Sequence, residues 1–113
     1  MPFIHIRTSD KLTDAQAEEL KNRLGETIGI ISGKTEKMLM IHIEDGCRMY
    51  YQGKNGAALI DTMIAGHAPR EDFERHGEVV TRIFSEITGM PSERVYIKYG
   101  EMPLCGLDGK LKF

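Results

Sequence analysis

The chain has no tryptophan, only two cysteines and no long apolar run among its 113 residues. Cys47 and Cys105 are far apart and form no CxxC pattern, which fits reduced thiols in a cytosol. No stretch approaches the roughly 20 apolar residues of a membrane-spanning helix, and no signal peptide precedes the first expected strand. We therefore expect a cytoplasmic protein without a membrane partner, with leaderless export as the alternative.

An excess of positive charge is also missing. The 15 lysines and arginines are scattered and outnumbered by 17 acidic residues, so the formal net charge is −2. Nucleic-acid-binding proteins usually gather basic residues into a patch, so we expect no nucleic-acid partner. The apolar fraction of 41% is that of an ordinary globular protein, and a chain of this length can bury a core without metal or disulfide support. We therefore expect residues 1–113 to form one domain.

Sequence patterns that bind metals or phosphate are absent as well. The four histidines, His5, His42, His67 and His76, show no metal-ligand spacing and are explained more simply as residues on strand and helix surfaces. The glycine-bounded turn at Lys54 lacks the GxxxxGK pattern of a phosphate loop. The sequence therefore predicts no metal and no cofactor.

What the sequence does contain is a weak duplication. Ile31-Ser32-Gly33 recurs as Ile87-Thr88-Gly89, and the same offset aligns Leu39-Met40-Ile41 with Val95-Tyr96-Ile97. Each half reads as a helix, a glycine stop, a short turn and an apolar strand. Two β-α-β units with right-handed crossovers predict an α/β (α+β) fold, in which a four-stranded main sheet has both helices on one face.

Local patterns place the expected elements. In the first half, residues 3–7 alternate as a strand, Thr13 opens a helix with Gln16 completing a capping box, and residues 38–43 form the next strand. In the second half, we expect a hairpin turn at residues 53–56, a helix at 70–86 and a strand at 94–99. The sheet face away from the helices keeps many apolar side chains, so oligomerisation is expected to cover it.

Pro2 is the most informative single residue. Removal of Met1, which is usual when a small residue follows, leaves a free prolyl amine in a rigid ring. This secondary amine leads directly into an apolar strand, and it can act as a general base or a nucleophile when it is unprotonated. The amine is blocked in any molecule that retains Met1.

Three features of the sequence resemble the tautomerase superfamily and, within it, the macrophage migration inhibitory factor family. They are the amino-terminal Pro2, the helix end Ser32-Gly33-Lys34, and the run SERVYIKY at residues 92–99. Chain length and element order also match. The resemblance implies a homotrimer of duplicated β-α-β protomers with three active sites at subunit interfaces. It also implies an isomerase whose prolyl nitrogen moves a proton between carbon and oxygen of a small α-keto acid such as phenylpyruvate.

The resemblance implies further substrate-binding residues. Lys34 matches the family's active-site lysine, Tyr96 matches a tyrosine contributed by the neighbouring subunit, and a backbone N–H within about one residue of Ile64 matches a group that contacts substrate. Lys98 stands where the family often has an asparagine, and it shares a strand face with Tyr96. Lys98 can therefore enter the pocket or lie at its rim with its alkyl stem packed. The CxxC and the carboxy-terminal tryptophan of animal members are absent.

The expected chemistry needs a base that is neutral near pH 7, a cation for the substrate carboxylate and a donor for the enolate oxygen. Burial of the Pro2 amine and repulsion by the Lys34 ammonium would both lower its pKa. Lys34 can therefore bind the substrate and also keep the base neutral.

Two other interpretations stay open. A hydratase or decarboxylase of the same superfamily would use the same amine, and the extra cation at Lys98 is compatible with it. A non-catalytic, ferredoxin-like domain that binds a small molecule or a protein can have the same β-α-β duplication. Such a domain has no evident use for a free Pro2 amine. No residue of the sequence bears on a cytokine-like role.

Overall fold

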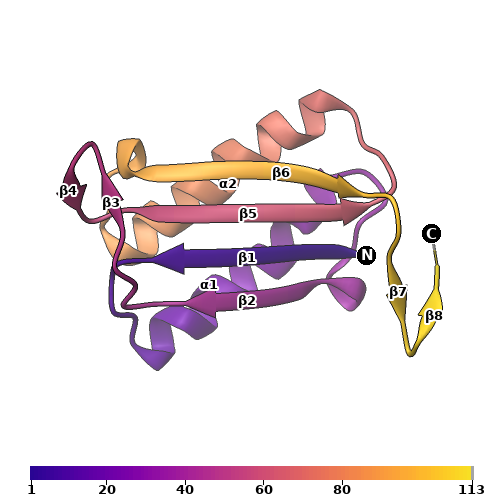
Figure 1. Cartoon of the computed structure of the whole chain (residues 1–113), viewed down its shortest axis with the longest axis horizontal. Helices are drawn as coiled ribbons and strands as arrows, with labels where there is room; N and C mark the ends of the chain where they lie inside the picture. Colours follow the sequence, from indigo (N-terminus) through magenta and orange to yellow (C-terminus); the bar gives the residue numbers. More distant parts are fainter. Residues whose placement is uncertain (113) are drawn as a thin grey trace.

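The computed structural model describes residues 1–112 and contains a four-stranded mixed sheet with two helices on one face (Figure 1). Its strand order is β2-β1-β5-β6, with β1 parallel to β2, β5 parallel to β6, and β1 antiparallel to β5. Each helix connects the strands of one parallel pair, which confirms the predicted duplicated fold. The bounds are β1 (Pro2–Thr8), α1 (Asp14–Thr27), β2 (Met40–Glu44), β5 (Ala58–Ala65), α2 (Arg70–Thr88) and β6 (Val95–Met102).

Short elements complete the chain. Three single-turn 3₁₀ helices are η1 (Ile28–Ile30), η2 (Glu36–Met38) and η3 (Ser92–Arg94), and two small hairpins are β3 (Tyr50–Tyr51) with β4 (Lys54–Asn55) and β7 (Gly106–Leu107) with β8 (Lys110–Leu111). The β7–β8 hairpin extends past the end of the main sheet, on the side where the amino terminus lies (Figure 1). Within residues 1–112, neither helix combines the length and the apolar character needed to traverse a lipid bilayer.

The core lies between the sheet and the two helices. Alternate residues of β1 and β5 are buried, as expected for strands with one covered face. The largest fully buried side chains come from both strands and both helices, and they are Ile4, Ile6, Leu20, Leu24, Ile28, Ile31, Ile60, Ile64, Val80, Ile83 and Phe84.

The predicted start of α1 is confirmed, but the α-helix ends earlier than the glycine stop at Gly33 implies. The Thr13 side chain accepts a hydrogen bond from the Gln16 N–H at 3.1 Å, and the Gln16 side chain accepts one from the Thr13 N–H at 2.9 Å. Apolar residues at helical spacing continue along the chain to Ile31, yet the α-helix ends at Thr27 and is followed by the tighter 3₁₀ turn η1. These apolar residues still reach the core because Ile28 and Ile31 stay buried on the same side.

The hairpin turn was predicted in the wrong place. Lys54 and Asn55 are not turn residues but form β4, and the turn consists of Gln52 and Gly53. Both turn residues have positive φ, 54° and 73°, as a tight two-residue hairpin requires. The sequence signal failed because glycines stand on both sides of Lys54-Asn55, and only the first of them occupies the turn.

The outer face of the sheet, away from the helices, is mixed rather than uniformly apolar. Phe3, Met40, Leu59 and Met63 alternate there with charged and polar side chains, namely His5, Arg7, His42, Glu44, Asp61, Tyr96 and Lys98. Met40 is 66% exposed and Tyr96 58% exposed in the single chain.

One buried ionisable residue attaches α2 to β6. His76 on α2 is fully buried, and its Nδ1 lies 2.6 Å from the Tyr99 hydroxyl on β6. Phe73 packs on the same tyrosine ring with centroids 5.0 Å apart. Burial lowers the pKa of His76 to about 4 and raises that of Tyr99, so both groups are neutral near pH 7.

We expect His76 to make stability depend on pH between about 6.5 and 4. The unfolded chain takes up the histidine proton below its ordinary pKa, whereas the folded chain resists it, so stability is complete above pH 6.5 and falls as the pH is lowered toward 4. The loss attributable to this residue is at most about 3–4 kcal/mol, since each unit of pKa is about 1.36 kcal/mol. His76→Leu should flatten that part of the curve in chemical unfolding at several pH values. Tyr99→Phe keeps His76 buried, so it should retain the dependence of the unfolding free energy on pH. If wild type and His76→Leu lose stability equally between pH 6.5 and 4, His76 is not the cause.

Candidate functional site

The start of β1 is the centre of the candidate site. Pro2 is buried and pairs with Ile64 across the antiparallel β1–β5 ladder. One residue further along β5, the Ala65 N–H donates to the Met1 carbonyl at 3.2 Å. Lys34 Nζ donates to the Ala65 carbonyl at 2.9 Å. The structure therefore brings together Pro2, Lys34 and Ile64, which the sequence predicted for the site.

A tight turn after η1 directs Lys34 back to the sheet. Gly33 has φ +80°, a conformation that favours glycine, and the Lys34 N–H closes the turn on the Ile31 carbonyl at 3.1 Å. Asp72 in the first turn of α2 fixes the turn by accepting hydrogen bonds from the Ser32 N–H at 3.0 Å and the Ser32 hydroxyl at 2.7 Å. These bonds lower the pKa of Asp72. The sequence reasoning did not single out Asp72, because its partner is distant in the chain.

A cavity of about 330 Å³ opens beside Met1 and Pro2. Its other walls come from η2 and the start of β2, including Met38 and Met40, and from the carboxy-terminal segment that contains Cys105 and Leu107. Cys105 Sγ lies 3.8 Å from Met1 Sδ, so the Met1 side chain occupies part of this space. The carboxy-terminal wall was missed by the sequence reasoning, which treated that segment only as lacking a tryptophan.

The electrostatics of this cavity favour an uncharged amine. Burial lowers the pKa of the Met1 amino group, and the neighbouring Lys34 ammonium lowers it further, whereas the negative charge of an ionised Cys105 acts in the opposite direction. The Pro2 nitrogen lies next along the backbone, so removal of Met1 would leave its amine close to the same cation and apolar walls. Burial at this cavity and the charge of nearby Lys34 thus both favour a neutral base at this end of the chain.

Tyr96 and Lys98 do not line this cavity within one chain. In the strand register, Pro2 pairs with Ile64, which in turn pairs with Glu101 on β6. Tyr96 on β6 pairs with Leu59 instead. Tyr96 is therefore five residues away from Glu101 along β6, which corresponds to about 17 Å. Tyr96 instead contacts the Tyr51 ring edge-on at 5.2 Å, and it borders a separate hollow of about 260 Å³.

Lys98 lies on the outer face of the sheet. Its side chain is 64% exposed, and Nζ is 3.5 Å from Asp61 Oδ2. In the single chain Lys98 is therefore part of an ion pair on the sheet surface and lies outside the Pro2 cavity.

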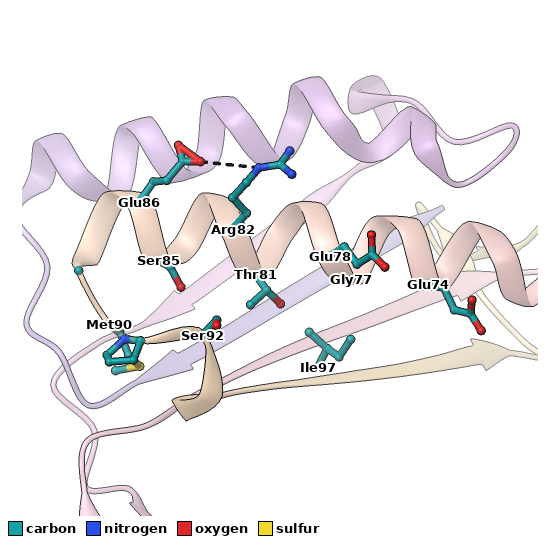
Figure 2. A pocket seen from close by; sticks show the side chains of 12 residues that line it. Glu74, Gly77, Glu78, Thr81, Arg82, Ser85, Glu86, Met90, Ser92 and Ile97 are labelled. Atoms are coloured by element: carbon teal, nitrogen blue, oxygen red, sulfur yellow. Dashed lines mark ion pairs between the residues drawn. The ribbon is translucent and has the colours of Figure 1, made fainter.

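A larger hollow of about 920 Å³ lies elsewhere, along the outer side of α2 and edge strand β6 (Figure 2). Gly77 and Ile97 border it where helix and strand approach closely, and a Cβ on Gly77 would lie only 2.5 Å from Ile97 Cδ1. The Arg82–Glu86 ion pair on α2 forms part of its rim. None of the predicted site residues lines this groove, so its size alone does not make it the functional site.

Comparison with known proteins identifies the class. The chain matches the family model of the macrophage migration inhibitory factor over residues 1–109. The structure of Leishmania major MIF2 superposes with a TM-score of 0.92 at 24% sequence identity, covering 98% of this chain and 97% of that chain. A macrophage migration inhibitory factor-like protein of Entamoeba histolytica gives 0.86 at 17% identity, with 97% of each chain covered. A comparison with curated protein sequences gives no match.

The fold and the family match are therefore those of a protein of the tautomerase superfamily. Within that superfamily, the chain belongs to the macrophage migration inhibitory factor family. The identities to the solved structures are low, so these structures establish the fold and leave activity to be argued from the site.

Lys34 should control the protonation of the amino terminus. Lys34→Gln removes a cation that lowers the pKa of the Met1 amine, so this pKa should rise in the variant. An NMR titration of an isotope-labelled amino terminus measures the effect directly. Lys11→Gln is the matched control, because exposed Lys11 lies beyond the opposite end of β1. A pKa that is unchanged or lower in Lys34→Gln would refute the electrostatic coupling.

Proposed function

We propose that the protein without Met1 is a cofactor-free tautomerase that interconverts the keto and enol forms of a small α-keto acid such as phenylpyruvate. The observation that supports this most directly is the position of Pro2. Pro2 lines a mostly apolar cavity, and Lys34 contacts the adjoining end of β5. Burial and Lys34 both lower the pKa of an amine at this end of the chain.

In the proposed reaction, the neutral Pro2 amine takes a proton from the carbon next to the keto group and returns it to the oxygen. The Lys34 ammonium has three donors, of which one is used by the Ala65 carbonyl, so it can also pair with the substrate carboxylate. A backbone N–H near Ile64 contacts the substrate, and the apolar walls keep the amine neutral.

A protein of the same fold supports a site for 2-oxo acids. The structure of Pt0534, described as inactivated by 2-oxo-3-pentynoate, matches with a TM-score of 0.80 at 16% identity, covering 95% of this chain and 93% of that chain. That inactivator has the 2-oxo carboxylate group that we assign to the substrate here.

We further propose a homotrimer in which the neighbouring subunit supplies Tyr96. Within one chain, Tyr96 is about 17 Å from the level of Pro2, so only a second copy can place it at the cavity. The carboxy-terminal segment also exposes Leu104, Leu107 and Leu111, at 69%, 54% and 70%, close to the cavity wall. Exposed leucines grouped in one short segment are typical of a surface that a partner covers.

The hydratase or decarboxylase alternative has less support. That alternative requires Lys98 as a second cation in the pocket, whereas in the single chain Lys98 forms an ion pair with Asp61. No contact in the described residues favours a purely non-catalytic ferredoxin-like domain.

Pro2→Gly should reduce phenylpyruvate keto–enol conversion by roughly 10²–10⁴-fold, the usual effect of losing a general base. Glycine keeps an amine but lacks the secondary, ring-constrained nitrogen. The assay follows the ultraviolet absorbance of the enol, after intact mass has shown that Met1 is absent from both proteins. Thermal unfolding checks that the variant is folded. Full turnover by Pro2→Gly, or by protein that retains Met1, would exclude Pro2 as the base.

A shared active site predicts complementation between two impaired variants. Pro2→Gly and Tyr96→Phe affect one site from different subunits, so mixed trimers contain some sites in which both native residues are present. Unfolding the two variants together and refolding them should restore part of the activity, whereas each variant refolded alone should not recover. Light scattering should give the mass of three chains. A stable monomer at micromolar concentration, or no gain on mixing, would contradict the trimeric site.

A further inference from the structure

A cluster of three potential metal ligands lies on the outer face of the sheet. His5 on β1 pairs with His42 on the parallel strand β2, and Glu44 follows His42 by two residues, so all three side chains share one face. One ligand atom from each residue can be chosen so that these atoms all lie within 4.8 Å of one another. Sequence spacing does not reveal this cluster, because His5 and Glu44 are 39 residues apart and only the strand register brings them together.

Contacts within the cluster hold the side chains in place. His5 Nε2 lies 2.5 Å from Glu44 Oε1, and the His5 side chain is only 11% exposed. The rings of His5 and His42 stack with centroids 4.4 Å apart and planes 5° apart. Arg7 Nε lies 3.8 Å from the same Glu44 oxygen and also restrains that carboxylate.

We propose that His5, His42 and Glu44 bind a divalent transition-metal ion, with Zn²⁺ as the ion that best fits the set. Two imidazoles and one carboxylate are a recurrent zinc ligand set, with metal–ligand distances of about 2.0–2.2 Å. Tetrahedral coordination at those distances separates ligand atoms by roughly 3.3 Å. The His5–Glu44 contact would therefore open by less than about 1 Å as the metal replaces the proton between them, and His42 would move inward.

Asp61 lies next to His5 in the strand register and can support such a site. The β1–β5 register places Asp61 directly opposite His5, on the side away from His42. Asp61 Oδ1 is buried and has no hydrogen-bond partner within residues 1–112, whereas Oδ2 faces Lys98 at 3.5 Å. A metal-bound histidine usually donates its second ring N–H to a carboxylate, and Asp61 Oδ1 is the acceptor adjacent to His5 for that bond.

This site is separate from the Pro2 cavity. Pro2 faces the helices, whereas His5 is three residues further along β1 and faces outward, because successive residues of a strand alternate between faces. Three protein ligands leave at least one coordination position for water or another donor. Metal binding is therefore expected with or without Met1, and its outcome is independent of tautomerase activity.

Calorimetry with Zn²⁺ on the untagged full chain tests the proposal, with visible absorption of the Co²⁺ form as a readout of coordination. Wild type should bind one ion per chain saturably. Asp61→Asn should weaken affinity by roughly 10–100-fold, as expected for loss of the outer carboxylate, and His42→Ala or Glu44→Gln should weaken it more.

His67→Ala is the matched control, because His67 also lies beside a carboxylate, 2.7 Å from Glu101, but outside the cluster. It should bind Zn²⁺ as wild type does. Circular dichroism confirms that each variant is folded. The proposal is overturned if wild type shows no saturable binding, or if His42→Ala and Glu44→Gln bind as tightly as His67→Ala.

Discussion

The antiparallel pairing of β1 with β5 at the centre of the sheet is the constraint on which the rest of the structure depends. It joins the two β-α-β halves and fixes which side chains of β1 face the helices. Because strand side chains alternate, a slip of one residue would move Ile4 and Ile6 out of the core and His5 into it. The same register places Pro2 opposite Ile64 and His5 opposite Asp61, so one pairing positions both the amine cavity and the outer cluster.

The duplication explains why the candidate chemistry is confined to one half. The offset that aligns Gly33 with Gly89 also aligns Pro2 with Ala58 and Lys34 with Met90. Both glycines have almost the same left-handed φ, 80° and 79°, so the two turns reverse the chain in the same way. Ala58 and Met90 are nevertheless buried, and neither has an ionisable group. Only a strand that starts at the chain terminus can present a free backbone amine, so the second half uses its equivalent positions for packing.

The sequence predicted those features that depend on nearby residues or on the family resemblance. The Thr13–Gln16 capping box and the start of α2 at Arg70 were confirmed, and Lys34 contacts Ala65 next to the Pro2–Ile64 pair. The features it could not predict depend on pairing between distant segments. The Asp72 contact to the Ser32 turn and the three-ligand cluster on the outer face are of this kind. Tyr96 and Lys98 form another case, because within one chain they lie away from the cavity, and only the proposed second subunit would bring Tyr96 to it.

Met1 changes the site in a way that links maturation to the proposed chemistry. While Met1 is present, its backbone blocks the Pro2 nitrogen, and its carbonyl accepts the Ala65 N–H at 3.2 Å. Its side chain also fills space beside Cys105. Removal of Met1 would free the prolyl amine, clear that part of the cavity and leave the Ala65 N–H without its acceptor. Ala65 follows Ile64 directly, so this released donor lies within one residue of the position that the family resemblance implies for a substrate-binding N–H. A single cleavage would therefore create both the base and a donor for the substrate.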